Sequence, residues 1–109
     1  MTRSGQVIMR TWRAEAGSSG AEGYEDHFRS EVMPTLRKLA GFQGAYVGRR
    51  DAGEGVELVV VTLWASLDAV REFAGPNIDH AVVHPDAAAV LPRWDQQVGH
   101  YDVIVNVSI

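Results

Sequence analysis

The sequence predicts a single α+β domain of ferredoxin-like order, in which strand, helix, strand, strand, helix and strand follow one another around an antiparallel sheet. Three observations support this fold class. Extended apolar segments begin the chain, occupy its middle and end it. Two segments with apolar residues at three-to-four spacing separate these extended segments. The two middle strands are joined by a short link of Asp and Gly residues, which suits a hairpin.

The first strand is expected at residues 6–14, where side chains alternate between two faces. A loop with serines follows, and an amphipathic helix is expected at residues 21–40. Pro34 lies inside this helix, where it removes a backbone donor and clashes with the preceding turn, so we expect a kink or a looser turn there. Gly41 ends the helix, as a C-terminal glycine usually does.

Two further strands are expected at residues 43–50 and 56–64, joined by the turn DAGEG. The second of these strands is apolar on both faces, which is typical of a strand with no side towards solvent. Each face of the sheet therefore needs a cover. Val59 and Val61 share one face and Val60 takes the other; the expected register places Val59 and Val61 at an interface.

The second helix is expected to begin after Ser66, which caps it, and to end at Gly75. A short helix is expected at residues 86–91, and the last strand at residues 98–107, where side chains again alternate in direction. No internal repeat, linker or low-complexity tract divides the chain. Residues 1–109 are therefore predicted to form one domain.

Composition and charge exclude several classes of function. Of the 109 residues, 46% are hydrophobic and 22% are charged, which is ordinary for a globular domain. The net charge of −4 and the scattered arginines argue against nucleic acid as a partner. No run approaches the roughly 18 apolar residues of a membrane helix, and the first residues lack the apolar core of a signal peptide, so we expect no membrane partner and a cytoplasmic location. The absence of cysteine excludes disulfides and thiolate metal sites.

A second copy of the chain is the expected partner. In this fold two helices cover one face of a four-stranded sheet and leave the other face open. An apolar open face implies an interface. A chain of this size buries only about two-thirds of the surface that its unfolded form exposes, so a partner subunit adds useful burial. We therefore predict a homodimer.

Several segments together resemble one known family. They are LWASLDAVREFAG after the third strand, RTW near the start, GAYVGRR in the second strand and GHYDV near the end. With these segments the chain resembles the antibiotic biosynthesis monooxygenase superfamily from about Val7 to Val105. The resemblance implies a dimeric α+β barrel, closed by the open sheet faces of two subunits. It also implies a small-molecule pocket between sheet and helices in each subunit.

This superfamily includes cofactor-free oxygenases of aromatic polyketides, haem-degrading enzymes, quinol oxygenases and members without a known activity. The fold alone does not choose among them. The resemblance to cofactor-free oxygenases implies a substrate that is deprotonated to an electron-rich phenolate or enolate, which itself reduces oxygen. The protein then supplies a base, a donor to the anion and a dry cavity.

Histidine is the expected base, because imidazole exchanges protons near neutral pH. His84 and His100 are the two candidates, and the sequence does not choose between them. His80 and His84 stand four residues apart, as two metal ligands on one helix face would. Pro85 and the preceding valines disfavour a helix there, so loop histidines at a pocket rim or on the surface are the plainer interpretation. His27 is expected to edge towards the sheet or solvent.

Arg10 is the expected donor to the substrate anion. It shares a strand face with Trp12, so under covering helices its guanidinium is either paired or directed at a ligand oxygen. Four aromatic side chains are expected to form walls for a flat ligand, since rings stack on rings: Trp12, Tyr46, Trp64 and Phe73. Ordinary core packing is the alternative for each of them.

No cofactor is expected, because the sequence has no cysteine thiolate, no phosphate loop or dinucleotide motif, and an incomplete haem pattern. It has no serine-hydrolase elbow either. The resemblance to haem-degrading members implies a Trp where this chain has Phe73 and an Asn in the first strand, which is absent, although His84 lies within a residue of the haem-ligating position. We predict a cofactor-independent monooxygenase that acts on an aromatic or polyketide-type small molecule. The alternatives are a non-catalytic dimeric domain that binds a small molecule and, with less support, a haem-binding or haem-degrading protein.

The space between sheet and helices distinguishes the first two interpretations. A cavity of about a few hundred Å³ that holds two or more unpaired polar groups favours an enzyme. A space filled by Trp12, Phe28, Trp64 and Phe73 favours a protein without catalysis.

Overall fold

All strands of the described chain belong to one antiparallel sheet in the computed structural model, which describes residues 6–107. They are β1 (Ile8–Ala16), β2 (Phe42–Ala52), β3 (Gly55–Trp64), β4 (Arg93–Trp94) and β5 (Gly99–Asp102). Their spatial order is β2-β3-β1-β4, and β5 also pairs with β1. The last strand therefore lies beside the first, as the ferredoxin-like order requires, and the predicted α+β class is confirmed.

The register of β1 and β3 determines which side chains face the helices. Trp12 lies opposite Val60, and both are buried. Burial alternates along β3, so that Val59 and Val61 are only half-buried. The expected register is therefore confirmed: Val60 points towards the helices, and Val59 and Val61 lie on the opposite, open face. The partner subunit that would cover this face stays a prediction.

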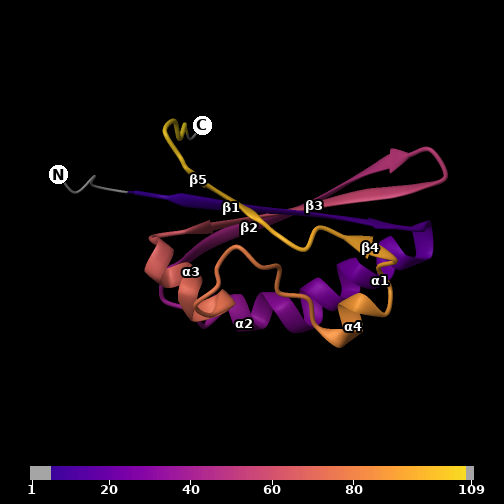
Figure 1. Ribbon diagram of the computed structural model, residues 1–109, viewed down its shortest axis with the longest axis horizontal. Helices are drawn as coiled ribbons and strands as arrows, with labels where there is room; N and C mark the ends of the chain where they lie inside the picture. The colour runs from indigo at the N-terminus through magenta and orange to yellow at the C-terminus, as the bar shows by residue number, and fades with distance from the viewer. Residues whose placement is uncertain (1–5, 108–109) are drawn as a thin grey trace.

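The helices lie together on one face of the sheet (Figure 1). They are α1 (Ser18–His27), the π-helical turn η1 (Phe28–Val32), α2 (Met33–Arg37), α3 (Leu67–Ala74) and α4 (Pro85–Ala88). Between these two layers lies the core, whose largest fully buried side chains are Trp64, Leu36 and Val70. No helix within residues 6–107 combines the length and the apolar character needed to span a membrane.

The first helical segment runs from Ser18 to Arg37 and widens at η1. Pro34 explains the widening, because it has no N–H to donate and its ring crowds the preceding turn. The N–H of Met33 donates to the carbonyl of Phe28, five residues earlier, as in a π-helix. The looser turn expected near the proline is therefore present. The helical segment begins and ends three residues earlier than the expected range of residues 21–40.

The predicted serine cap begins α3. The N–H of Ala69 donates to Oγ of Ser66 at 3.1 Å. Gly75, with a φ of 80°, ends the helix in the left-handed region that favours glycine. Gly41 packs against the same helix, since a Cβ on Gly41 would lie 2.2 Å from the Cβ of Ala69. The turn before β2 approaches α3 this closely only because residue 41 is glycine.

The C-terminal part differs most from the expectation. The helix expected at residues 86–91 is the single turn α4, which starts one residue earlier. The strand expected at residues 98–107 is limited to β5, because its partner β1 begins at Ile8, which pairs with Asp102. The strand β4 has only two residues, too few for a sequence pattern to predict. The other strands agree with their expected bounds to within two residues.

Candidate functional site

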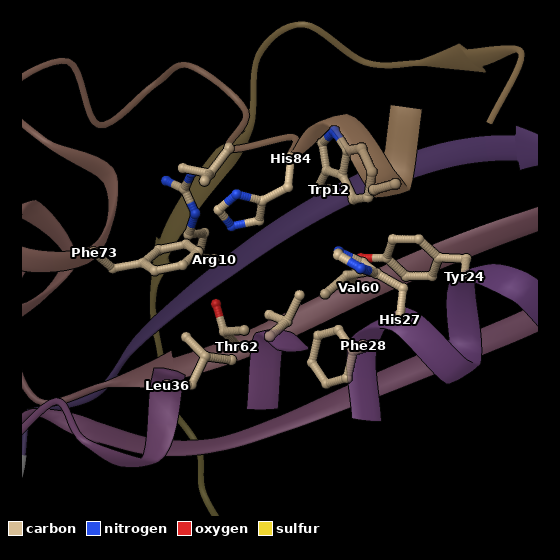
Figure 2. Close-up of a pocket in the computed structure, with 13 residues that line it drawn as sticks. Arg10, Trp12, Tyr24, His27, Phe28, Leu36, Val60, Thr62, Phe73 and His84 are labelled. Atoms are coloured by element: carbon tan, nitrogen blue, oxygen red, sulfur yellow. The ribbon is translucent and has the colours of Figure 1, made fainter. Parts of the chain in front are cut away.

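A cavity of about 50 Å³ lies between the central strands and the helices (Figure 2). Its lining combines apolar and aromatic side chains with a few polar ones: Arg10, Trp12, Tyr24, His27, Phe28, Val32, Leu36, Val60, Thr62, Phe73, Val82, His84 and Ala87. A cavity of this volume has room for a few water molecules, whereas benzene occupies one of about 150 Å³. An aromatic ring can therefore enter only if one wall moves outward.

The widened turn η1 brings one row of helical side chains onto the cavity. Tyr24, Phe28, Val32 and Leu36 all line it although they are spaced four residues apart. A spacing of four residues is longer than an α-helical turn of 3.6 residues, so on a regular helix successive members of this row would rotate away from the cavity. A π turn contains more residues per turn, and η1 therefore offsets the drift.

Arg10 reaches one end of the cavity from β1 and is only 5% exposed. Its guanidinium donates to the carbonyls of Ile78 and His80 and to Nε2 of His100, the last at 2.9 Å. Burial lowers the pKa of Arg10 to about 10, although the charge of Asp79 opposes this, so the group stays protonated at neutral pH. Within the described chain these bonds use three of its five N–H donors, and two are left for a ligand.

His100 stands behind Arg10 rather than in the cavity wall. Because an arginine only donates, Nε2 of His100 must accept, which assigns the ring proton to Nδ1. Nδ1 lies 3.5 Å from a carboxylate oxygen of Asp79. Burial and the positive charge of Arg10 lower the pKa of His100, with Asp79 opposing them. This geometry suits a residue that orients Arg10, since the nitrogen that would accept a substrate proton is already occupied.

His84 forms the cavity wall that borders solvent. It is exposed, it directly precedes α4, and its ring meets that of His27 edge to face with 6.1 Å between the centroids. His80 does not line the cavity, although its backbone carbonyl binds Arg10. The structure thus does not bring His80 and His84 together in this cavity. Residues 6–107 contain no group of three or more His, Asp or Glu side chains that could hold a metal ion.

His27 is a cavity residue that sequence reasoning missed, since it is expected at the sheet or in solvent. It is 7% exposed, and its side chain lines the cavity from the end of α1 (Figure 2). Its Nε2 is fully buried and has no hydrogen-bond partner among the described residues. Burial raises the pKa of the neighbouring Tyr24, whose phenol therefore stays neutral. The spacing of His27 three residues after Tyr24 is the signal that could have revealed its position.

The four aromatic residues expected as walls have different positions. Trp12 and Phe73 line the cavity, and the indole N–H of Trp12 donates to a backbone carbonyl at 2.8 Å. Trp64 is fully buried and stacks behind Phe73, with ring centroids 5.6 Å apart. Tyr46 lies opposite Val61 on the open face and is 69% exposed, so it is remote from the cavity.

The cavity meets one of the two conditions stated for an enzyme. Two residues that line it carry polar atoms without a partner in the described chain, namely His27 at Nε2 and Arg10 with two N–H donors. Its volume of about 50 Å³, however, is below the few hundred Å³ of ordinary ligand sites, and a haem is far larger than this space. Val82 and His84 are the part of the lining that borders solvent.

Several solved structures resemble this one at low sequence identity. A candidate antibiotic biosynthesis monooxygenase from Caulobacter crescentus aligns with a TM-score of 0.67 and 16% identity, over 91% of this chain and 91% of that chain. SnoaB, a cofactor-independent oxygenase from Streptomyces nogalater, aligns with a TM-score of 0.60 and 19% identity, over 95% of this chain and 98% of that chain. A candidate antibiotic biosynthesis monooxygenase from Bacillus cereus aligns with a TM-score of 0.57 and 18% identity, over 95% and 97%.

No model of a protein family matches the sequence, and no curated protein matches it either. The solved structures support the resemblance to the antibiotic biosynthesis monooxygenase superfamily at the level of the fold. At this sequence identity the likeness shows the fold alone, and the activity has to be argued from the cavity.

Proposed function

We propose that the protein is a cofactor-independent oxygenase that acts on a flat aromatic small molecule bound between the sheet and the helices. One observation supports this most: the guanidinium of Arg10 and the imidazole of His84 stand on walls that are otherwise largely aromatic and apolar. A reaction through a substrate anion requires such a donor and such a base. The fold shared with the oxygenase SnoaB is consistent with this chemistry.

In the proposed reaction His84 accepts a proton from a phenol or from an activated ring CH₂ group. Arg10 donates to the substrate oxygen on which negative charge builds up. The electron-rich anion passes electrons to molecular oxygen, and a carbon–oxygen bond forms at the ring carbon. When a CH₂ group becomes a carbonyl group, one oxygen atom enters the product and the other leaves as water with the two hydrogens. The apolar walls keep solvent away from the anion.

Binding of a ring requires the cavity to open. We expect the side chains of Val82 and His84 to move outward, because they form the wall nearest to solvent. The opposite walls are less free to move. Phe73 is stacked between Trp64 and the guanidinium of Arg10, which lies 5.8 Å from its ring centroid.

The proposed functional unit is a homodimer in which the open faces of two sheets meet. The centre of this face is apolar, and charged side chains stand beside it. Its apolar members are Met9, Val59, Val61 and Leu63, and its charged neighbours are Arg13, Glu15, Arg50 and Glu57. An apolar centre with a charged rim is typical of a protein interface.

Oxygen uptake tests the proposed activity. Purified protein should speed oxygen consumption by an anthrone-type or naphthol-type substrate above the spontaneous rate, without added flavin, metal or nicotinamide. His84→Ala should lower the catalysed rate about a hundredfold or more, because a general base is lost. Arg10→Ala should lower it, and Arg10→Lys should restore only part, because a point charge replaces a planar fork. His80→Ala, which removes an imidazole outside the cavity, is the control and should keep the rate.

A non-catalytic domain that binds a small molecule is the second candidate. Two observations favour it: the small volume of the cavity, and the bonds that already hold Arg10 to Ile78 and His80. In that case an aromatic ligand binds, but oxygen uptake stays at the protein-free rate with every electron-rich phenol. This result would replace the first proposal by the second.

A further inference from the structure

We infer that His27 anchors a hydroxyl group of the ligand at the end of the cavity away from Arg10. His27 would thereby fix the orientation of the ligand in the proposed function, on which this inference rests in one respect: an aromatic ring must bind in the cavity.

The first argument is the burial of an unpaired nitrogen. Nε2 of His27 is inaccessible to solvent, and no residue of the described chain bonds to it. A buried polar atom without a partner lowers stability, and most buried polar atoms in proteins have one. A leucine would fill the same place without this penalty. The histidine is explained if a bound molecule supplies the missing partner.

The second argument is the chemistry around His27. Its ring centroid lies 6.2 Å from that of Tyr24, which is buried and neutral. Figure 2 shows His27 and Tyr24 on the side of the cavity away from Arg10 and Phe73. An anionic group of the ligand is therefore stabilised at the Arg10 end, and a neutral group is favoured at the His27 end. A hydroxyl both donates and accepts, so it can pair with either tautomer of the imidazole.

The two ends of the cavity then recognise two different oxygens of one ligand. The hydroxyl group pairs with His27, and a carbonyl or developing anion pairs with Arg10. Thr62 supports the second end: its Oγ1 accepts from the indole N–H of Trp64 at 2.8 Å, and its own proton is left to donate. Its hydroxyl lies between the helical side of the cavity and Arg10 (Figure 2). Once the wall has moved outward, a ring with oxygens on opposite edges can pair with both ends.

A pair of probes of matched shape tests the role of His27. The dissociation constants of 2-naphthol and 2-methylnaphthalene are measured by calorimetry for the wild type, His27→Leu and His80→Leu. The first probe has a hydroxyl where the second has a methyl group. We expect the preference for 2-naphthol to fall about tenfold in His27→Leu, with little change for 2-methylnaphthalene, because one hydrogen bond is lost. His80→Leu, an imidazole outside the cavity, should keep the wild-type preference.

The outcomes separate this inference from the proposed function. If both probes bind and the preference is the same in the wild type and in His27→Leu, Nε2 of His27 does not bond to the hydroxyl group and the anchor is refuted, while ring binding stands. If neither probe binds to the wild type, the aromatic site is refuted and the anchor with it. His27→Leu removes an unpaired polar atom, so it should fold with an unchanged or higher melting temperature, which makes a loss of preference attributable to the hydrogen bond.

Discussion

Arg10 joins three parts of the molecule at one point. From β1 it donates to two carbonyls of the segment between α3 and α4, and to His100 on β5. A buried guanidinium is tolerated when its donors are paired, so these bonds stabilise the fold. The donors that stay free point to the proposed role in binding an anion. Arg10 thus has a structural role in addition to the proposed one.

Protonation of His100 should destabilise the protein. Its pKa is lowered in the folded state by burial and by Arg10, so the unfolded chain takes up a proton at a higher pH than the folded chain does. The contribution of His100 to stability is therefore complete above the ordinary value of 6.5, and it is lost as the pH falls from 6.5 through the lower pKa of the folded state. The cause is local, because a protonated Nε2 cannot accept from Arg10.

Urea unfolding at about one pH unit above and about one unit below the ordinary histidine pKa checks this prediction. The wild type should lose more free energy of unfolding between the two conditions than His100→Gln, whose amide oxygen can accept from Arg10 at both. His80→Gln, which changes an exposed histidine, should behave like the wild type. An equal loss in the wild type and in His100→Gln would show that Nε2 is not the acceptor.

At this scale the sequence predicts side chains whose position follows from strand alternation. Arg10 and Trp12 share the helix-facing side of β1, as alternation requires. The position of Tyr46 needs the register between two strands, and this register shifts at an irregularity near Gly44 that no local pattern reveals. His27 lies three residues after Tyr24, which is the spacing of a side chain on the same helix face. Its polar character hides this signal, because polar side chains are expected on the outer side of a helix.

Among the elements, η1 shows how a single proline shapes the cavity. Pro34 removes a hydrogen-bond donor, and the widened turn that results keeps Phe28 and Leu36 on the cavity side. The sequence predicts the loosening from the proline. It cannot predict the exact turn type, because that depends on how the helix packs against the sheet. The short α4 and β4 are set by tertiary contacts in the same way, since neither is long enough for a periodic pattern.

The turn before β2 packs so closely against α3 that a side chain at residue 41 should destabilise the protein. Gly41→Ala would bring two Cβ atoms to 2.2 Å, so either the turn or α3 must shift. We expect a loss of about 1–3 kcal/mol in the free energy of unfolding, measured with urea. Gly17→Ala is the control, because no atom lies within 4 Å of its added methyl group; since Gly17 is the N-cap of α1, where alanine is disfavoured, it should lose no more than about 1 kcal/mol. Equal stability of both variants would contradict the close packing.

For the molecule as a whole, the open face of the sheet leads to the prediction of a homodimer. Val61→Asp places a charge at the centre of this face, where a partner subunit would bury it without a counter-charge. Its dimer dissociation constant, measured by sedimentation, should rise at least about a hundredfold. Leu67→Asp, on the outside of α3, should sediment like the wild type. A wild type that is monomeric at micromolar concentration would contradict the dimer.

The fate of molecular oxygen tests the proposed oxygenase most directly. The protein is incubated with an anthrone-type substrate under heavy-isotope oxygen gas, and the product is analysed by mass spectrometry. We expect one labelled oxygen atom per product molecule, at a rate that rises in proportion to protein concentration and is lost in His84→Ala. A product that forms at the same rate without protein, or equally fast in His84→Ala, would contradict a catalytic cavity.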